Sequence, residues 1–476
     1  MRMSDSEALM WAVEKDPALR CDFCNLTIVD GPIDRRRMRA TVERAVRAIP
    51  RLSQRVVEPS VPVATPDWVD ETDLDIDDHI RWVELGGNGD MRALLDACEA
   101  LSEPAFDRSK PLWEFIVVEG LDGDRTALLQ RLHHTITDGV GGLKLSLEIV
   151  DIDADGRGAD TAAATSDAAD DQDARDGVDG DSAEDPRPSI VASARSFITD
   201  SASRGLEASG AVIGGARRAI TDPLAAPRRV AGAWSLAGSL RRQLLVLDGA
   251  KSDVMDDRSL HRHFEVRTYS MPDAIKAAKN LGGSVNDVFV TALASALGAY
   301  HAELGSHTTE LRMAMAVNTR GRGDQAANRF SPTRVIVPIG PIAERDRFAE
   351  IHRRLDTTKR EPAVVATESI ASLVSTLPAP FLVALARSQA RTIDFATSNL
   401  RGSPIPLYLA GRRIVGNYAL GPRVGCALNV TLMSFCDDMH VGLNIDPAAI
   451  CDIPTFAAKL DTAFTTLLAP EVAYAS

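Results

Sequence analysis

The sequence predicts an α/β protein with mixed sheets, built as two lobes. Short apolar runs typical of strands alternate with segments of helical periodicity along both halves of the chain. The chain has 476 residues, and a single hydrophobic core rarely organises that many. With 45% hydrophobic and 25% charged residues, its composition is that of a globular protein that can bury sizeable cores.

A capping residue, a run of strand-forming residues and a stripe of apolar residues predict the first three elements of the chain. Ser4 or Ser6 is expected to cap a helix through residues 8–12, and the run CNLTIVDG, residues 24–31, predicts a strand that enters a turn. The stretch MRATVERAVRAI, residues 38–49, places its apolar side chains on one stripe and predicts a second helix. The first lobe therefore begins with a helix, a strand and another helix.

A hairpin is predicted next, and its second strand ends on two histidines. Residues 115–134, FIVVEGLDGDRTALLQRLHH, hold two strand-like runs on either side of an Asp-Gly pair, which is a hairpin signal. The second run ends at His133 and His134. The stretch VGGLKLSLEIV, residues 140–150, then predicts a helix because its apolar residues share a face.

The second half of the chain supplies further strands and helices. Helices are expected over residues 273–280, from Ser284 along the apolar run to His301, and over residues 454–469. The predicted strands are HFEVRTYSM, RMAMAVNTR, TRVIVPIG, RRIVGNYAL, GCALNVTLMSF and MHVGLNID.

An acidic segment divides the chain. Residues 151–187 hold twelve Asp and one Glu against three Arg, with no aromatic residue, so they cannot bury enough apolar surface to offset their chain entropy. We therefore predict a first lobe at residues 1–150, a disordered linker at residues 151–188 and a second lobe at residues 189–476. The formal net charge of −14 falls to about −4 without this segment, so the lobes are only mildly acidic.

Charge and hydropathy limit the partners and the location. No basic face stands out and the pI is near 5.2, so we expect no nucleic-acid partner. The first residues lack the features of a signal peptide, and no stretch reaches 18 consecutive apolar residues. We expect a cytoplasmic protein whose membrane contact, if any, is peripheral. The apolar-basic stretches 189–224 and 228–247 are interpreted either as helices of the second lobe or as attachment to anionic lipid.

The six cysteines are scattered without the spacing of a disulfide scaffold, which fits a reducing cytoplasm. Cys21 and Cys24 have the CxxC spacing of redox and metal sites, but no second CxxC follows. Because their segment also reads as a strand entering a turn, a structural role is favoured over a redox site.

The stretch HHTITDG, residues 133–139, allows three interpretations: an acid–base site, a metal site, or two core histidines beside a turn. Adjacent side chains on a strand point to opposite faces, so the two imidazoles do not easily reach one ion. A zinc site would need Asp138 and a further ligand, for which no cluster has convincing spacing. Acid–base chemistry needs only one imidazole facing the substrate. Spacing alone leaves a catalytic histidine and a buried core pair balanced.

Asp138 and Gly139 stand where the second strand of the hairpin turns into the next helix. Asp138 suits a helix cap, or an ion pair with an arginine that holds the shape of the loop. Gly139 permits tight backbone geometry and close approach by another segment or a ligand. Both roles are structural.

HHTITDG resembles the HHxxxDG motif of the acyl-CoA-dependent acyltransferase superfamily. Other stretches resemble the bacterial wax ester synthase/diacylglycerol acyltransferase family, in the same order along nearly the whole chain. They are Pro111-Leu112-Trp113, Asn286-Asp287, Asn328-Arg329, Ser398-Asn399 with Gly402, LDIDDHIRW and VGLNIDPAAICDIP. Three positions depart from the family pattern: Glu7 where an Asp is common, Ala327 where a Gly is common, and the loop LRGSP after Ser398-Asn399.

The resemblance implies an architecture and a reaction. It implies two lobes like those of chloramphenicol acetyltransferase, with an active-site channel between them. It implies that His134 is the general base, supported by His133 and Asp138, and that it takes a proton from an alcohol as the oxygen attacks an acyl-CoA thioester. Because the thioester is already activated, acyl-CoA serves as co-substrate and no metal or other cofactor is expected. The implied acceptors are diacylglycerol or a long-chain alcohol, met at a membrane or lipid-inclusion surface.

Two polar pairs in the second lobe belong to the same resemblance. Asn286 is a candidate donor to the oxyanion of the reaction, and a helix-start hydrogen bond with Asp287 is its alternative. Ser398 and Asn399 either position a substrate or form an ordinary Asx-type turn. Two other functions stay open: acyl transfer to another alcohol or amine, and lipid binding without catalysis.

Overall fold

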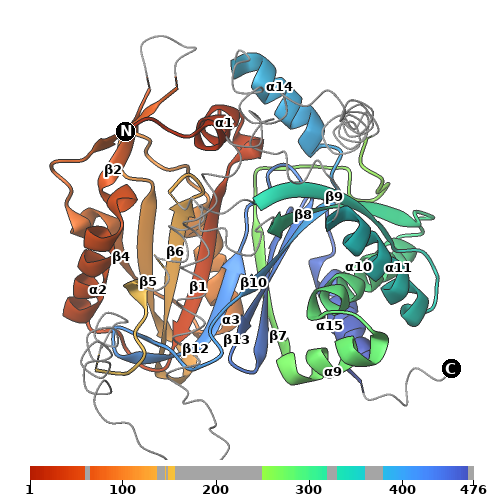
Figure 1. Ribbon diagram of the computed structural model, residues 1–476. Coiled ribbons are helices and arrows are strands. Elements are labelled where there is room, and N and C mark those ends of the chain that lie inside the picture. Colours follow the sequence, from red (N-terminus) through yellow and green to blue (C-terminus); the bar gives the residue numbers. More distant parts are fainter. Residues whose placement is uncertain are drawn as a thin grey trace, which may run out of the picture.

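The computed structural model describes residues 1–58, 65–136, 145, 148–155, 249–318, 330–359 and 379–469. Two six-stranded sheets form the centres of two lobes (Figure 1). Each sheet contains parallel and antiparallel pairs of strands. The predicted α/β class with two lobes and mixed sheets is confirmed.

The first sheet is antiparallel except for its last pair of strands. In spatial order its strands are β11 (Tyr408–Leu409), β12 (Arg412–Leu420), β1 (Asp22–Val29), β6 (Arg125–His133), β5 (Trp113–Leu121) and β4 (Ile80–Glu84). The pair β5 and β6 is the predicted hairpin, and β6 ends at His133, one residue before the predicted end at His134. A separate ribbon pairs β2 (Gln54–Val57) with β3 (Asp67–Asp70).

The second sheet has a parallel centre and antiparallel flanks. In spatial order its strands are β7 (His263–Ser270), β14 (Asp438–Ile445), β13 (Leu428–Phe435), β10 (Phe395–Arg401), β8 (Glu310–Asn318) and β9 (Phe330–Pro338). Strand β10 runs parallel to both of its neighbours, and the other pairs are antiparallel. All of these strands except β10 were predicted.

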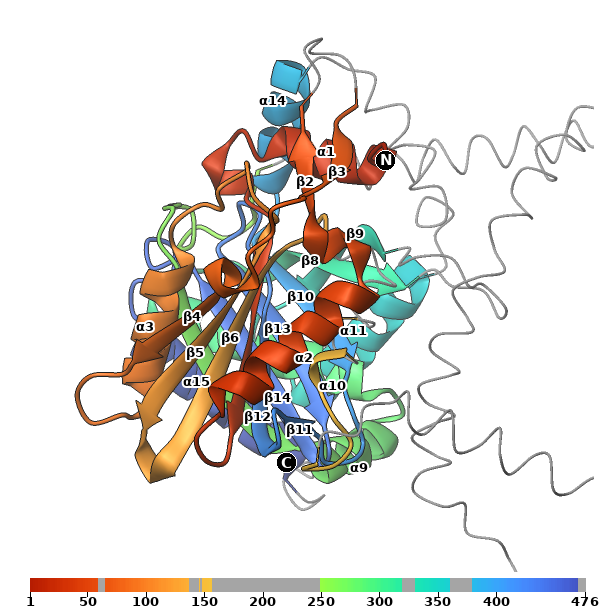
Figure 2. The same ribbon diagram turned by 90° about the vertical axis from the view of Figure 1, so that its left-hand side faces the viewer.

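Helices cover the outer faces of both sheets (Figures 1 and 2). Helix α2 (Arg35–Ala48) covers the first sheet. The second sheet is covered by α9 (Met271–Leu281), α10 (Val285–Glu303), α11 (Glu344–Lys359) and α15 (Ile453–Leu468). Helix α3 (Met91–Ser102) packs between β5 and β7, so it touches both lobes. Helices α1 (Asp5–Val13) and α14 (Ala379–Ala390) meet at one end of the molecule.

The N-terminal helices form for the reasons that the sequence indicates. Ser4 caps α1 in a capping box, in which its hydroxyl accepts from the Glu7 backbone and the Glu7 carboxylate accepts from the Ser4 backbone at 2.6 Å. Helix α2 buries the predicted stripe of Met38, Val42 and Ala45 against the first sheet. Helix α2 thereby covers one face of the first sheet.

Helix α10 is the central helix of the second lobe. Ser284 caps it, as predicted, and most of its side chains are buried. Gly298 lies against the backbone carbonyl of Ile339, where a Cβ would come within 2.1 Å of the oxygen. Only glycine lets the helix approach the end of β9 this closely.

The two lobes do not divide at one point in the sequence. The predicted second lobe, residues 189–476, includes β11 and β12, but β12 pairs with β1 and belongs to the first sheet. Gly442 in β14 allows this crossing, because its missing Cβ leaves room for the carbonyl of Ala419 in β12. The predicted boundary is therefore wrong for residues 408–420. These residues belong to the first lobe because β12 forms backbone hydrogen bonds with the edge of β1 that would otherwise be unpaired.

Some predictions lie outside the described residues and some elements were not predicted. The helix predicted at residues 140–150 is described only in part, and the predicted linker only to residue 155. The apolar-basic stretches 189–224 and 228–247 lie outside the described ranges. The ribbon, β4, β10, β11 and helices α3, α11 and α14 were not predicted.

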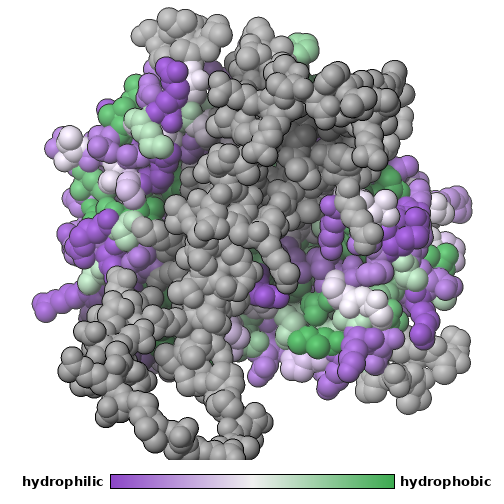
Figure 3. Space-filling view, viewed as in Figure 1, coloured by the Kyte–Doolittle hydropathy of each residue, from purple (hydrophilic) through white to green (hydrophobic). Residues whose placement is uncertain are grey.

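One face of the molecule shows how polar and apolar residues are distributed. In the view of Figure 3, hydrophilic residues dominate it and hydrophobic ones appear in separate groups. No single helix in the described ranges is long and apolar enough to cross a membrane. Helices α9 and α10 pass that test only as a pair bent by 93°.

Candidate active site

The two histidines lie at the end of strand β6, next to the start of β1. His133 is the last residue of β6 and lies opposite Asp22 in the antiparallel register, while His134 stands in the turn that follows. His133 is buried, with 3% of its surface exposed, whereas His134 is exposed. The two side chains have different neighbours, as expected for adjacent residues at a strand end.

His133 is held by hydrogen bonds on both ring nitrogens. Its Nε2 lies 2.6 Å from a carboxylate oxygen of Glu14, and its Nδ1 lies 2.7 Å from the Thr135 hydroxyl and 3.2 Å from the Thr135 backbone nitrogen. A backbone N–H can only donate, so Nδ1 is the acceptor and the ring proton sits on Nε2, facing Glu14. His133 is thus fixed in one orientation and one tautomer.

Glu14, at the end of α1, is the anchor of this arrangement. Its carboxylate accepts from His133, from the Cys21 backbone and from Arg108 at 3.2 Å. Burial alone would raise the pKa of Glu14, but the bonds from His133 and Cys21 and the charge of Arg108 hold that pKa below its ordinary value. Glu14 therefore stays ionised, and Trp11 packs on both His133 and Arg108.

His134 lies in a different environment. Its ring meets Phe23 of β1 edge to face, with 5.5 Å between the ring centres. The residue as a whole is exposed, while desolvation by the surrounding protein lowers the pKa of its imidazole, with a further decrease from the neighbouring His133. The His134 ring is therefore accessible and mostly neutral near pH 7.

Asp138 and Gly139 complete the motif in the sequence, but both lie outside the described residues. Their predicted roles in shaping the turn stay predictions.

Asn286 and Asn399 are brought together from distant parts of the second lobe. Asn286 lies in the first turn of α10 and accepts a hydrogen bond of 3.2 Å from the side chain of Asn399 on β10. The Nδ2 atom of Asn286 is enclosed by protein and has no hydrogen-bond partner in the described part of the chain. The hydrogen bond to Asn399 ties the start of α10 to β10 through the Asn286 oxygen, so the role of the Nδ2 donor toward an oxyanion stays a prediction.

Asp287 completes the capping box of α10 with Ser284 rather than binding Asn286. Its carboxylate accepts from the backbone and hydroxyl of Ser284, each at 2.8 Å, and lies 2.9 Å from Nδ1 of His352. The alternative of a hydrogen bond between Asn286 and Asp287 is thus wrong, because the capping box with Ser284 takes the Asp287 carboxylate. Ser398, beside Asn399, is half-buried on β10.

The cysteine pair behaves as the structural interpretation expects. Cys21 and Cys24 are both buried, and burial raises the pKa of each thiol, that of Cys24 to about 11. A redox cysteine needs a lowered pKa and access to solvent, so this pair lacks both properties. Within the described ranges, no three His, Cys, Asp or Glu side chains gather where a metal ion could bind.

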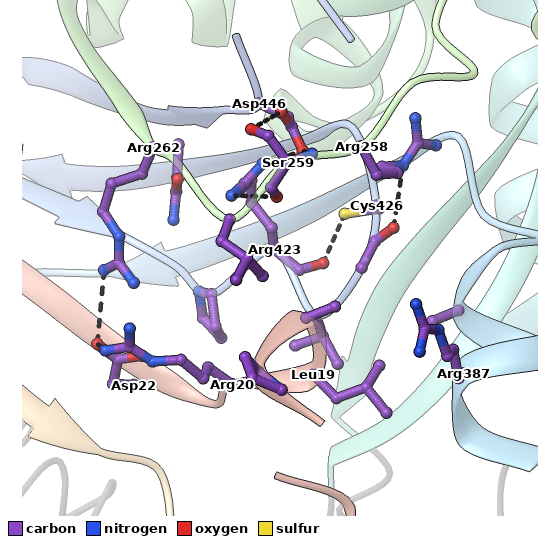
Figure 4. Close-up of a pocket in the computed structure, with 18 of the residues that line it drawn as sticks. Leu19, Arg20, Asp22, Arg258, Ser259, Arg262, Arg387, Arg423, Cys426 and Asp446 are labelled. Atoms are coloured by element: carbon purple, nitrogen blue, oxygen red, sulfur yellow. Dashed lines mark hydrogen bonds and ion pairs between the residues drawn. The ribbon is translucent and has the colours of Figure 1, made fainter. Parts of the chain in front are cut away.

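A cavity of about 260 Å³ lies where the lobes meet, next to the start of β1 (Figure 4). Its walls come from residues 17–22 of the first lobe and from residues 258–262, 387–391 and 422–426, with Glu103, Asn444 and Asp446. Asp22, which lies opposite His133, is one of the lining residues. The cavity and the histidines thus share the first residues of β1.

Comparison with known proteins decides the family. The model of the wax ester synthase/diacylglycerol acyltransferase catalytic domain matches residues 3–289, and the model of the C-terminal domain matches residues 327–468. The chain belongs to the wax ester synthase/diacylglycerol acyltransferase family. It is therefore an acyltransferase, as its motif indicated.

Relatives in this family match along most of their length. A putative diacylglycerol O-acyltransferase of Mycobacterium tuberculosis is 32% identical over 98% of this chain and 92% of its own. A probable diacylglycerol O-acyltransferase of the same species is 24% identical over 93% of this chain and 90% of its own.

Solved structures share the fold. The wax ester synthase/diacylglycerol acyltransferase from Marinobacter aquaeolei VT8 matches with a TM-score of 0.60 at 18% identity, over 98% of both chains. A starter condensation domain of rhizomide synthetase, solved with C8-CoA and Leu-SNAC, matches with a TM-score of 0.56 at 12% identity, over 98% of this chain and 93% of its own.

The sequence of this acyltransferase pointed to the two histidines but not to the residues that hold His133 in place. Glu14 and Arg108 were not singled out, and no local pattern marks Glu14, which lies 119 residues from His133. The arginines of the cavity were also missed. The run DRSLHRH, residues 257–263, was a usable signal, since it concentrates basic residues in a chain of net charge −14.

Proposed function

We propose that the protein is an O-acyltransferase that moves a long-chain acyl group from acyl-CoA to diacylglycerol or to a long-chain alcohol, with His134 as the general base. One observation carries the proposal. In a motif that the chain shares with its family, His134 has an accessible imidazole of lowered pKa, directly after a histidine whose two nitrogens are occupied. Only the second imidazole is accessible to a substrate.

The proposed reaction is a direct transfer. The neutral imidazole of His134 accepts the proton of the acceptor hydroxyl while that oxygen forms a bond to the thioester carbonyl carbon. The carbonyl oxygen carries the negative charge of the tetrahedral intermediate. When the intermediate collapses, the carbon–sulfur bond breaks, and the leaving thiolate takes the proton back from the imidazolium. The products are an ester and free CoA, and His134 is neutral again.

The lowered pKa of His134 suits this role. A general base must be unprotonated at the working pH, and burial keeps the imidazole neutral at pH 7. The imidazolium that forms during the reaction is correspondingly acidic, which favours return of the proton to the leaving thiolate.

His133 and Glu14 are proposed to position His134 rather than to react. The bonds from Glu14 and Thr135 fix the backbone at the end of β6, from which the next residue projects. Misplacing a catalytic group by about 1 Å can cost about a hundredfold in rate. A rigid residue directly before the base therefore serves the reaction without contacting the substrate.

The proposal includes the setting of the reaction. We propose that acyl-CoA is the only co-substrate and that no cofactor takes part, because the thioester already activates the acyl group. We also propose a cytoplasmic protein that meets its water-insoluble acceptors at the inner membrane face or at lipid inclusions. Fractionation of cells producing a tagged protein tests this location, and recovery only in the lipid-free soluble fraction would contradict it.

The reaction is tested with purified protein, labelled palmitoyl-CoA, and either diacylglycerol or hexadecanol as the acceptor. We expect a labelled ester with at least one acceptor, identified by mass spectrometry, and its loss in His134→Ala. His307→Ala is the matched control, since His307 is exposed and lies outside the motif. The proposal fails if the wild type makes no ester with either acceptor, or if His134→Ala keeps full activity.

A further inference from the structure

The cavity between the lobes is strongly basic in an otherwise acidic protein. Six arginines line it, against three carboxylates, so its walls carry a formal surplus of three positive charges. The arginines are Arg20, Arg258, Arg262, Arg387, Arg391 and Arg423. The whole chain has a formal net charge of −14. A positive recess in an acidic molecule concentrates the electric field and attracts anions to that place.

The carboxylates at the cavity do not neutralise these arginines. Asp22 is shared, lying 3.0 Å from Arg20 and 3.5 Å from both Arg262 and Arg131. Arg423 pairs with Asp446. Figure 4 marks the contact between Arg262 and Asp22.

The arginines on the other side of the cavity have fewer carboxylate partners. Arg387 pairs with Asp16 at 3.2 Å. Among the described residues, Arg258 donates to three backbone carbonyls and to no carboxylate. In the part of the chain that the structure describes, Arg391 has no carboxylate partner. This side of the cavity therefore has guanidinium groups available for an anionic ligand.

One buried donor at the cavity lacks a partner. The side chain of Arg262 is only 10% exposed, and its Nε has no hydrogen bond to any described residue. A buried guanidinium nitrogen without a partner is costly, because it has lost water and gained nothing in exchange. A ligand oxygen in the cavity would satisfy it.

The first residues of β1 connect the cavity to the histidines. Asp22 lines the cavity and lies opposite His133, while the next residue, Phe23, contacts the ring of His134. The backbone N–H of Cys21, between Arg20 and Asp22, binds the Glu14 carboxylate that anchors His133. The cavity and the two histidines therefore meet at residues 21–23, at the start of β1.

We propose that this cavity binds the phosphate groups of the CoA carrier, and so holds the acyl donor while its thioester reaches His134. This inference rests on the proposed function for the identity of the donor. Guanidinium groups bind phosphate by paired, charge-assisted hydrogen bonds, and CoA carries all of its phosphates on the nucleotide end, away from the thioester. The volume of about 260 Å³ is below that of a site for a whole drug-sized ligand, which suits a charged end group.

The test compares two acyl donors in arginine variants. Arg391→Gln and Arg387→Gln remove charge from exposed side chains and leave the buried cluster around Asp22 intact. For palmitoyl-CoA we expect KM to rise about tenfold or more in the double variant, as loss of charge-assisted hydrogen bonds predicts. For the palmitoyl thioester of N-acetylcysteamine, which has no phosphate, we expect KM to stay within about twofold.

A control variant away from the cavity shows whether the change in KM is specific to the cavity arginines. Arg353→Gln removes an arginine from the exposed face of α11, away from the cavity, and should change neither KM. An unchanged KM for palmitoyl-CoA in the double variant would overturn the inference. So would an equal rise for both donors, because that result would indicate a general structural defect.

A binding measurement that needs no turnover tests phosphate recognition by the cavity independently of the proposed reaction. Adenosine 3′,5′-bisphosphate, which has phosphates but no acyl group, should bind the wild type and Arg353→Gln in calorimetry and bind the double variant about tenfold more weakly. This result would stand even if the protein made no ester. If the double variant instead keeps bisphosphate binding and loses binding to phosphatidic acid vesicles, the cavity recognises a lipid headgroup and the inference is wrong.

Discussion

His133 and His134 are identical side chains joined by one peptide bond, yet they lie in opposite environments. His133 is buried and hydrogen-bonded through both nitrogens to Glu14 and Thr135. His134 is accessible, contacts Phe23 edge to face and has a lowered pKa. The difference shows that, in a motif of two adjacent histidines, one can be accessible to a substrate while the other holds the local backbone in place.

The strongest test of this comparison is loss of the accessible imidazole. We expect His134→Ala to lower kcat/KM for palmitoyl-CoA by about 10²–10⁴-fold, the usual contribution of a general base. Thermal unfolding should change less than in His133→Ala, because His134 is exposed whereas His133 is buried and bonded to Glu14 and Thr135. Steady-state kinetics and calorimetry of the same sample measure both effects, and a large fall in Tm with intact turnover would reverse the assigned roles.

Loss of the buried imidazole should act on stability first. His133→Ala leaves the buried Glu14 carboxylate without one of its donors, and we expect the free energy of unfolding to fall by about 1–3 kcal/mol. Urea denaturation measures this change. His134→Ala serves as the control, and an equal or larger loss in that variant would contradict the comparison.

The contact between Glu14 and His133 can be isolated by a double-mutant cycle. Glu14→Gln, His133→Ala and the double variant should show a coupling energy of about 0.5–3 kcal/mol in urea denaturation, because each residue acts through the other. The same cycle with His307→Ala in place of His133→Ala should give no coupling. Additive losses in the first cycle would mean that the 2.6 Å contact contributes nothing to stability.

The smallest expected effect is on pH dependence. Burial holds the pKa of His134 below its ordinary value of 6.5, so the neutral form predominates at pH 7 and is lost as the pH falls through the lowered value. We therefore expect kcat/KM to be flat around pH 7 and to decline below pH 6.5. The residual activity of His134→Ala should not show this decline at low pH. An acid limb with an apparent pKa above 6.5 would contradict the assignment.

The same lowered pKa has a consequence for stability. The unfolded chain binds a proton at His134 more readily than the folded chain does, so this residue favours the folded state less as the pH falls below 6.5. His79, His301 and His440 are buried with lowered pKa values and add to the same trend.

The local features of the site could be predicted from the sequence. The hairpin that ends on the histidines, the Ser4 and Ser284 caps and the opposite environments of His133 and His134 all follow from periodicity and side-chain chemistry within short windows. The family resemblance added the choice of His134 as base, which the spacing had left open.

The features that join distant segments could not be predicted. Glu14 reaches His133 only because α1 and η1 (Pro17–Leu19) fold back to the start of β1, and the six arginines of the cavity come from four separate segments. Periodicity reports which face of an element is buried but not which other element covers it. The strand β12 was predicted as a strand, and its place in the first sheet was missed for the same reason.

That strand has a consequence for how the protein is made. Asn25 of β1 and Asn417 of β12 are 392 residues apart and hydrogen-bond at 2.8 Å. While the chain is being synthesised, β1 has no partner on this side until most of the protein has left the ribosome. During that time it is an open strand edge, the kind that pairs with other chains. We therefore expect a chain that lacks β12 to aggregate more readily than the whole chain.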